Sequence, residues 1–357
     1  CMKKLTKIFI IIISDIVLLC LLAVITYNVN LKAVSKDTSE KIVEIKPGSI
    51  RSIASTLKEH HLIRNELSFR IYIKLNNITN LKVGYYKLNE GMDVKEIVNN
   101  LVKGSTYNPN EINITFKEGL NIRKYAELIE ENTTNSKEDF IKLVNDKEFI
   151  NKLINDYWFL TDDIVNDNIY YKLEGYLFPN TYTFASVDVS LEDIIYKLLN
   201  ETDKQLSKYK DLIDSSSYSV HELLTLASIV ELEGSNSDDR KGVAGVFYNR
   251  LNNGWTLGSD ATTYYANKID DWTYSLSYKE LNNCNNKYNT RCSKINGLPV
   301  GPISNPGIES IVAVLEPTLH DYFYFVADCT GKTYLTKNST EHNNIINKLK
   351  QEGKWCA

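Results

Sequence analysis

The sequence has few of the features that mark several common classes of protein. It contains only 2 Met and 16 Gly among 357 residues, which excludes a Met-rich adaptor surface and a Gly-rich low-complexity chain. The formal net charge is only −4, so the basic face that nucleic-acid binding usually needs is missing. No C-x-x-C pair and no paired histidines occur at the spacing of metal ligands. We therefore expect no nucleic-acid partner, no metal and no cofactor.

Hydrophobic and aromatic residues are plentiful by contrast. The chain has 4 Trp, 11 Phe and 23 Tyr, and 43% of its residues are hydrophobic. This composition can form packed cores and excludes wholesale disorder. At roughly 100–200 residues per domain, the length suits two or three domains.

One apolar run near the amino terminus is long enough to cross a membrane. It has about 20 residues, from Ile8 to Tyr27, which match a bilayer core of roughly 30 Å. Asp15 costs about 2.5–3.5 kcal/mol on insertion, whereas the Ile, Leu, Val and Phe residues together contribute about −4 to −8 kcal/mol. We therefore predict a transmembrane helix over residues 8–28.

The flanking residues predict the orientation of this helix. Lys3, Lys4 and Lys7 precede it and no basic cluster follows closely, so the positive-inside rule places residues 1–7 in the cytoplasm. Residues 29–40 are polar and read as a short stalk, after which the chain lies outside the cell membrane.

A cleaved signal peptide and a lipoprotein are the alternatives to a retained anchor. The apolar run exceeds an ordinary signal-peptide core, and no clear A-x-A cleavage site follows Ala23. Cys20 follows two leucines, and apolar residues continue beyond it, which is unlike a lipoprotein site. A retained single-pass anchor is therefore the favoured prediction.

Four cysteines lie beyond the membrane run, where an extracytoplasmic compartment allows pairing. Cys284 and Cys292 share one polar loop and could form a bridge, while Cys329 and Cys356 lie further on. The spacing leaves the connectivity of all four open.

Residues 41–106 read as a small α/β domain. The expected elements are a strand at 41–46, a helix after Pro47-Gly48, a helix at about 66–75, a strand in 81–88, and a helix from Asp93 to about 102 that Gly104 ends. A similar strand, turn and helix recur at 111–132. This plan is that of LysM-like glycan-binding modules, although a generic βα unit has the same pattern.

The region 107–357 is expected to be mainly helical, with β strands and long loops, so that the whole chain is α+β. The clearest elements are helices at 221–233, 241–251, 308–315 and 340–351 and strands at 322–327 and 333–336. Residues 252–307 are rich in Gly, Pro, Asn and Tyr and read as one irregular stretch. So long a loop in a compact domain usually lines a functional site.

Two glutamates at the end of an apolar helix are the first candidates for chemistry. Glu231 and Glu233 are two residues apart, so they point about 200° away from one another. Glu231 continues the apolar face of Ala227 and Val230, whereas Glu233 stands beside Gly234 at the helix end. A carboxyl on an apolar wall has a raised pKa and can act as a general acid near neutral pH. An isolated pair of this kind is more often a solvated helix end.

The surroundings of these glutamates change that interpretation. Seven segments in a fixed order resemble the MltG/YceG family of endolytic murein transglycosylases: EGYLFPNTYTF (174–184), LASIVELEG (226–234), VAGVFYNRL (243–251), LGSDATTYYA (257–266), NGLPVGPISNPGI (296–308), YFYFVAD (322–328) and TEHN (340–343). The match covers nearly everything after the membrane run. The segments are individually weak, but the ordered set is highly specific.

The resemblance implies a reaction and a catalytic residue. The family's catalytic glutamate is the second in its S-I-[IV]-E-x-E pattern, which here is Glu233. The implied reaction cleaves the β-1,4 bond between N-acetylmuramic acid and N-acetylglucosamine in nascent glycan strands and leaves a 1,6-anhydro end. The resemblance also implies work beside peptidoglycan synthases, as a terminator of strand growth.

Further residues match the family's motifs and are expected to support the site. Glu174 is expected to be a hydrogen-bonding or positioning group near the cleft, or a purely structural one. The other candidate substrate-binding or supporting residues are Glu231, Asp260, Thr262, Tyr288, Asn289, Asn305, His342 and Asn343. Ala261 and Gly258 replace a Pro and a Gln that the family usually has, and Val300 replaces a common Pro.

Two other functions remain open from the sequence. A muramidase-type hydrolase would use Asp260 as the base that activates water, and would leave a reducing end. A non-catalytic glycan-binding scaffold would be expected to lack the acid, but Glu233 is present.

Overall fold

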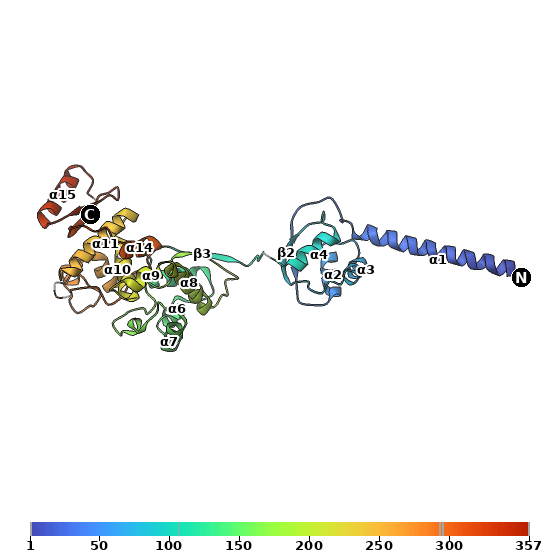
Figure 1. Ribbon diagram of the computed structural model, residues 1–357, viewed down its shortest axis with the longest axis horizontal. Coiled ribbons are helices and arrows are strands. Elements are labelled where there is room, and N and C mark those ends of the chain that lie inside the picture. Colours follow the sequence, from blue (N-terminus) through green and yellow to red (C-terminus); the bar gives the residue numbers. More distant parts are fainter. Residues whose placement is uncertain (1, 106, 293, 295, 356–357) are drawn as a thin grey trace. The chain divides into compact units, whose positions relative to one another are not determined.

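The chain forms two compact units. The computed structural model describes residues 2–105, 107–292, 294 and 296–355. The units are Cys1–Asn110 and Glu111–Ala357, and Figure 1 labels the elements of each along the chain. Helices and short strands alternate in both, so the fold is a mixed α and β one.

The amino-terminal helix carries the apolar run. Helix α1 spans Met2–Leu31, and within it Ile11–Leu31 is long and apolar enough to cross a membrane. None of that window is buried inside the protein, and large side chains such as Leu19 are 65% exposed. An apolar helix that is exposed on its whole circumference needs a non-aqueous surrounding, whereas Leu31 at its end packs against the small unit.

The segment expected as a stalk is not a free one. The Arg64 guanidinium donates to the backbone carbonyl of Ala33 at 2.7 and 2.9 Å. Ser35 N–H donates to Glu90 O, and Gly91 N–H donates to Asp37 O. Backbone groups at 33–37 therefore find partners in the small unit, and this corrects the expected stalk over 29–40.

The small unit packs three helices on a two-stranded antiparallel sheet. Strand β1 (Lys41–Ile45) pairs with β2 (Gly84–Leu88), with Lys41 opposite Leu88 and Ile45 opposite Gly84. Alternate residues Val43 and Ile45 enter the core. The helices are α2 (Ile50–Glu59), α3 (Glu66–Leu75) and α4 (Val94–Lys103).

The helix and strand boundaries expected from the sequence in this unit agree closely with the structure. The Asp93 side chain and Glu96 form a capping box at the start of α4. Gly104, at φ +99°, ends the helix in a conformation that other residues rarely adopt. Only the second strand differs, because it begins at Gly84 rather than at 81.

The large unit begins with the second strand, turn and helix. Strand β3 (Ile112–Phe116) pairs antiparallel with β4 (Asn180–Phe184), and α5 (Ile122–Asn132) packs beside β3. The helices that follow α5 are α6 (Lys137–Leu143), α7 (Lys147–Asp156), α8 (Leu191–Leu206) and α9 (Lys210–Ser215), with 3-10 turns at Asp162–Val165 and Ser207–Tyr209.

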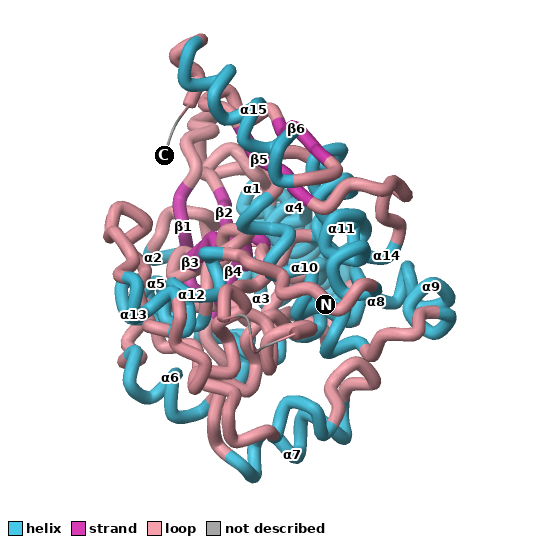
Figure 2. The backbone as a smooth tube through the Cα atoms, turned by 90° about the vertical axis from the view of Figure 1, so that its left-hand side faces the viewer, coloured by secondary structure: helices cyan, strands magenta, loops and turns pink. Residues whose placement is uncertain are grey.

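Three mutually packed helices form the centre of the large unit. They are α10 (Val220–Glu233), α11 (Ser237–Asn252) and α14 (Ile308–Leu315), and Figure 2 shows them side by side. Strands β5 (Tyr324–Ala327) and β6 (Thr333–Thr336) pair with one another, and α15 (Ser339–Gln351) packs on both. The predicted apolar face of α10 (Leu223, Leu226, Ala227 and Val230) is buried.

The stretch 252–307 is less irregular than expected. It contains α12 (Asp260–Ala266) and the single turn α13 (Tyr278–Leu281). Helix α12 is hard to detect from the sequence because its seven residues include Thr and Tyr, which are weak helix formers. Tertiary packing of buried Ala261, Thr262 and Tyr265 stabilises it instead.

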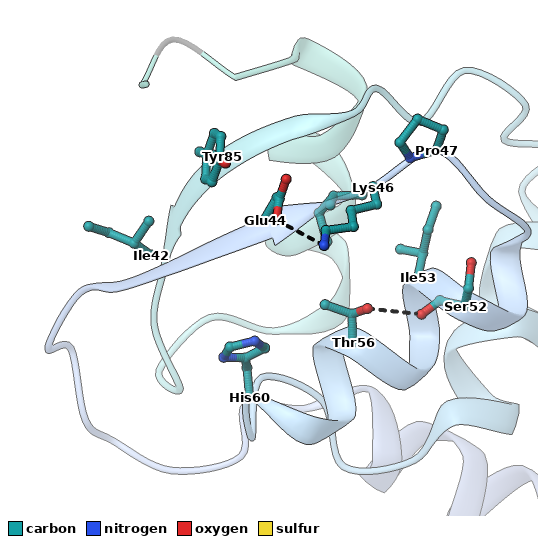
Figure 3. Close-up of a pocket in the computed structure, with 10 residues that line it drawn as sticks. Ile42, Glu44, Lys46, Pro47, Ser52, Ile53, Thr56, His60 and Tyr85 are labelled. Atoms are coloured by element: carbon teal, nitrogen blue, oxygen red, sulfur yellow. Dashed lines mark hydrogen bonds and ion pairs between the residues drawn. The ribbon is translucent and has the colours of Figure 1, made fainter. Parts of the chain in front are cut away.

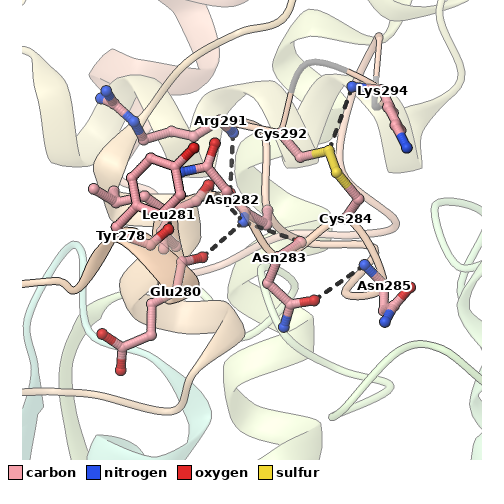
Figure 4. The surroundings of a disulfide bond; sticks show 12 residues. Tyr278, Glu280, Leu281, Asn282, Asn283, Cys284, Asn285, Arg291, Cys292 and Lys294 are labelled. Atoms are coloured by element: carbon pink, nitrogen blue, oxygen red, sulfur yellow. Dashed lines mark hydrogen bonds between the residues drawn. A yellow bond between two sulfur atoms is a disulfide. The ribbon is translucent and has the colours of Figure 1, made fainter.

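A disulfide closes part of this stretch. Cys284 and Cys292 are joined, with their Cα atoms 5.3 Å apart, and Figure 4 shows the bridge beside the turn that follows α13. Cys356 lies outside the described residues, so any pairing that involves it stays a prediction. The loop inside the bridge contains Tyr288 and Asn289.

Candidate active site

The site begins with the way α10 is fixed. Ser219 and Glu222 form a capping box at its start, and every residue from Leu223 to Val230 is buried. The helix ends where Gly234 N–H donates to Val230 O. Because the buried body of the helix cannot rotate, its last turn holds Glu231 and Glu233 in fixed directions.

Glu231 points into the protein and is fully engaged there. Arg240 donates to its Oε1 at 2.8 Å, and its side chain is only 5% exposed. Gly307 N–H and Ser310 Oγ donate to its Oε2 at 2.9 and 2.7 Å. A carboxylate with a charged partner and two further donors is fixed in place, so Glu231 joins α10, α11 and α14 and both of its oxygens are occupied.

Glu233 has a different environment. Ser259 Oγ donates to its Oε1 at 2.6 Å, and of the residues that the structure describes none hydrogen-bonds to Oε2. Burial raises the pKa of the Glu233 carboxyl, the charge of Asp260 raises it further, and the Ser259 hydrogen bond, Arg250 and Arg291 oppose the rise. A half-buried carboxyl with one free oxygen and a raised pKa is suited to donate a proton.

Ser259 is itself held in place from three sides. Its backbone N–H donates to Thr290 Oγ1 at 3.2 Å, and its carbonyl accepts from Thr262 Oγ1 at 2.7 Å. Thr262 Oγ1 and Thr290 Oγ1 are 2.8 Å apart. Thr262, one of the expected supporting residues, therefore acts on Glu233 through Ser259 and is itself completely buried.

Two arginines lie in the electrostatic environment of Glu233. Arg291 Nη1 donates to Asp260 Oδ1 at 2.6 Å, in a pair that is about half exposed. Arg250 donates to Phe323 O at 2.8 Å and to Leu257 O, and it is buried against the rings of Tyr324 and Phe325. Both cations favour the ionised form that Glu233 has after giving up a proton.

Glu174 is completely buried and connects three segments. Its carboxyl accepts from Ile122 N–H at 3.0 and 3.1 Å, at the start of α5, and from the Tyr265 hydroxyl of α12 at 2.8 Å. Asn305 Nδ2 lies 3.4 Å from its Oε1. Burial raises the pKa of Glu174 to about 8, against the opposing effects of these hydrogen bonds and of Arg123. Its described contacts are all internal.

Asn305 is buried beside Glu174 and bonds backbone groups. Its Oδ1 accepts from Gly175 N–H and Leu177 N–H at 3.0 and 3.1 Å, and its Nδ2 donates to Leu120 O at 3.1 Å. Gly175 has φ +83°, and a Cβ there would lie 2.4 Å from Pro302. The EGYLFP and NPG motifs thus meet across a contact that admits only glycine.

Tyr288 and Asn289 are also buried. The Tyr288 ring packs on Tyr170 and Tyr265, with ring centroids 4.9 and 4.8 Å apart. Asn289 Nδ2 contacts the carbonyls of Glu280, Leu281 and Asn283 at 3.0–3.1 Å, and its Oδ1 accepts from Thr263. Both residues therefore fix the loop that carries Thr290 and Arg291, and neither presents its side chain to solvent.

His342 and Asn343 lie on α15. The His342 ring packs against Tyr324, with centroids 5.4 Å apart, and burial and the charge of Arg250 lower its pKa. Asn343 is exposed. His342 is thus connected to the surroundings of Glu233 through Tyr324 and Arg250, whereas the contacts of the described residues do not connect Asn343 to them.

Ser259, Thr290, Arg250 and Arg291 were not among the residues predicted for the site. Three of them lie inside segments that were recognised: Ser259 opens S-D-A-T, Thr290 closes Y-N-T, and Arg250 ends Y-N-R. Ser259 directly precedes Asp260, and this position could have indicated that it belongs to the site. The position of Arg291 depends on how the disulfide-closed loop folds back, which no short motif predicts.

The described residues contain no cluster of three or more His, Cys, Asp or Glu side chains that could hold a metal ion. Glu233 can give and take a proton, and the two arginines stabilise its ionised form.

The chain is similar to proteins of one known family. The model of the YceG-like family matches residues 43–348. The chain belongs to this family. A YceG-like relative from Bacillus subtilis, named endolytic murein transglycosylase, is 38% identical over 322 residues, which are 89% of this chain and 87% of that protein.

Two further YceG-like proteins extend the comparison. A Streptococcus pneumoniae protein of the same name is 35% identical over 318 residues, which are 85% of this chain but 57% of that longer protein. A crystal structure of a yceG-like protein from Listeria monocytogenes superimposes with a TM-score of 0.61 at 39% identity. It covers 87% of this chain and all of that one.

The buried Glu174 carboxyl gives a prediction for stability. Burial raises the pKa of Glu174 to about 8 in the folded protein, from the ordinary value of 4.5 that applies to the unfolded chain. Between these values the folded protein keeps the proton and the unfolded one has lost it, so the free energy of unfolding should fall as pH rises from about 4.5 to 8. Glu174→Gln should flatten this part of the curve, because Gln keeps an acceptor for Ile122 N–H but does not titrate.

Urea unfolding at several pH values measures this slope. Glu148→Gln, at an exposed position, is the control for loss of a glutamate elsewhere. Equal slopes for the native protein and Glu174→Gln would show that the Glu174 carboxyl does not hold a proton in the folded state.

Proposed function

We propose that this chain is a membrane-anchored endolytic transglycosylase of peptidoglycan, a lyase that uses Glu233 as acid and then as base. The observation that carries the proposal is the contrast between the two glutamates of α10. Glu231 is locked by Arg240, Gly307 and Ser310. Glu233 has a raised pKa, one hydrogen bond and a free oxygen. The name of the relatives, endolytic murein transglycosylase, supports the same reaction.

In the proposed reaction Glu233 first donates one proton to the substrate and then takes one proton back from it. Protonated Glu233 gives its proton to the glycosidic oxygen, and the bond from that oxygen to C1 of N-acetylmuramic acid breaks. The resulting carboxylate takes the proton of the muramic 6-hydroxyl, whose oxygen closes onto C1. The products are a free 4-hydroxyl on N-acetylglucosamine and a 1,6-anhydro ring, and Glu233 is protonated again.

Ser259 and the arginines favour the first proton transfer, because they stabilise the ionised Glu233 that it produces. After the first proton transfer Glu233 is ionised, and Ser259 Oγ, Arg250 and Arg291 all favour that form. Burial favours the protonated form before the transfer. Burial and these donors thus act in opposite directions on the pKa of Glu233, which has to act as acid and as base in one cycle.

A hydrolase that uses Asp260 is less well supported. Asp260 pairs with Arg291 at 2.6 Å, so its Oδ1 faces a cation and is less available to take a proton from water. A hydrolytic glycosidase also needs two carboxyl groups with separate roles, and Glu231 is unavailable. A non-catalytic scaffold would not require a half-buried Glu233 carboxyl with a raised pKa.

The products of the full-length protein test the proposal. Uncrosslinked peptidoglycan is incubated with the protein in detergent, and glycan fragments are weighed by mass spectrometry. We expect ends lighter by one water than reducing ends, and Glu233→Gln should abolish them with little change in melting temperature. Reducing ends would support the hydrolase, and a large loss of stability in Glu233→Gln would make Glu233 structural.

Removal of the Ser259 hydroxyl should change the pH profile. Its hydrogen bond lowers the pKa of Glu233, so Ser259→Ala should raise that pKa further. The falling limb of kcat/KM, which follows loss of the acid's proton, should then move to higher pH. Ser277→Ala, whose hydroxyl caps α13 instead, is the matched control. An unmoved limb in a folded, active Ser259→Ala would contradict this role.

The orientation of the anchor remains a proposal of the same kind. Lys3, Lys4 and Lys7 before the apolar part of α1 support a cytoplasmic amino end and an extracytoplasmic catalytic unit. Protease added to intact cells should then digest the large unit; its full protection would reverse the orientation. The association with peptidoglycan synthases stays a prediction from the family resemblance.

The small unit is proposed to bind glycan in the manner of LysM-like modules. It has the order strand, helix, helix, strand, with its two strands antiparallel. A groove of about 530 Å³ lies between β1 and α2, and Figure 3 shows Ile42, Tyr85, Thr56 and His60 around it. The half-buried Tyr85 ring beside hydroxyl and imidazole groups suits the apolar face and polar edge of a sugar.

Retention on insoluble peptidoglycan tests this groove. In the inactive Glu233→Gln background, Tyr85→Ala should lower the retained fraction because a stacking face is lost. Leu75→Ala removes a side chain that is 67% exposed and does not line the groove, and should leave retention unchanged. Equal retention of the two variants on peptidoglycan would show that the groove does not bind glycan.

A further inference from the structure

A small cavity lies next to the end of α10. Its volume is about 90 Å³, and its lining includes the apolar side chains of Leu232, Ala261 and Ile303. Leu232 directly precedes Glu233, and Ala261 directly follows Asp260. Glu233 itself does not line the cavity, and no residue of the cavity takes part in the proton transfers.

Two aromatic rings stand at the same cavity. Tyr264 and Trp272 line it, with ring centroids 5.0 Å apart and planes inclined by 51°. The Tyr264 hydroxyl donates to Tyr274 O at 2.5 Å, which fixes its ring. Trp272 is nevertheless 56% exposed. The exposed face of this large ring, next to an apolar cavity, is available to contact a ligand.

The charges at the cavity are neutralised within the protein. Arg123 pairs with Asp270 at 2.5 Å, and Asn121 Nδ2 donates to the same carboxylate at 2.8 Å. Lys124 pairs with Glu127 at 2.8 Å. Each cation that lines the cavity thus already contacts a carboxylate, which disfavours a carboxylate or phosphate ligand. Arg123 Nη1 is buried without a hydrogen-bond partner among the described residues, so a neutral ligand that carries a carbonyl acceptor fits better.

The volume limits what can enter. Sites for whole drug-sized ligands measure about 300–1,000 Å³, so a cavity of about 90 Å³ admits a substituent rather than a sugar ring. An acetamido group is small and neutral and has a methyl end for the apolar wall. Its pyranose ring would stay outside, where Trp272 and Tyr264 offer flat faces.

We propose that this cavity is a subsite for N-acetylglucosamine, with the acetamido methyl against Leu232, Ala261 and Ile303 and the sugar ring on Trp272. The proposal rests on the proposed function, because it assigns the sugar to the strand whose bond Glu233 breaks. Trp272 is a specificity-determining residue in this arrangement and takes no part in the chemistry.

Calorimetric binding of chitotetraose, a neutral oligomer of N-acetylglucosamine, tests the subsite without turnover. The full-length Glu233→Gln protein in detergent is the parent. Trp272→Ala on that parent should weaken binding about tenfold, and Trp272→Phe should recover much of the loss, since an aromatic face contributes on this order. Tyr278→Ala is the matched control, because Tyr278 is 83% exposed in the same segment but does not line the cavity.

A second measurement separates the subsite from the reaction. With Glu233 intact, Trp272→Ala should raise KM for uncrosslinked glycan while kcat and its pH profile stay close to those of the native protein. Chitotetraose binding that is equal in Trp272→Ala and its parent overturns the subsite and leaves the transglycosylase proposal standing. Binding that depends on Trp272, in a protein that makes no anhydro ends, overturns the reaction and leaves the subsite standing.

Discussion

The hydrogen bond from Ser259 to Glu233 is the interaction on which the site depends. It joins the end of α10 to the start of α12 and fixes one oxygen of a half-buried carboxyl. Burial alone would favour a permanently protonated glutamate, and an ion pair alone would favour a permanently ionised one. The hydrogen bond from Ser259, with Arg250 and Arg291 acting at longer range, opposes the rise in the pKa of Glu233 that burial causes.

Most of the motif residues support that bond indirectly. Thr262 and Thr290 hold Ser259, and Asn289 and the Cys284–Cys292 bridge hold the loop that carries Thr290. Asn305 and Glu174 join α5, α12 and the NPG loop around the same centre. The motif residues thus form a network of buried hydrogen bonds. Loss of one partner would leave a buried polar group unpaired, which would lower the stability of the folded protein.

Local elements of the fold could be read from the sequence because their signals are local. The capping box at Asp93, the glycine at Gly104 and the apolar periodicity of α10 depend on neighbours within a few residues. Helix α12 was missed because its stability comes from packing against distant segments. The contacts of residues 33–37 with Arg64 and Glu90 were missed for the same reason.

The sequence by itself determined the apolar helix and the order of the elements through side-chain period, and its ordered motifs carried the family resemblance. The prediction that Glu233 is the catalytic residue follows from that resemblance. Only the tertiary structure distinguished the environments of the two glutamates. Glu231 is bound by Arg240 and by groups 76 and 79 residues away, and Glu233 by a serine 26 residues away. The proton affinity of a carboxyl depends on burial and on the donors around it, and both arise only when distant segments pack together.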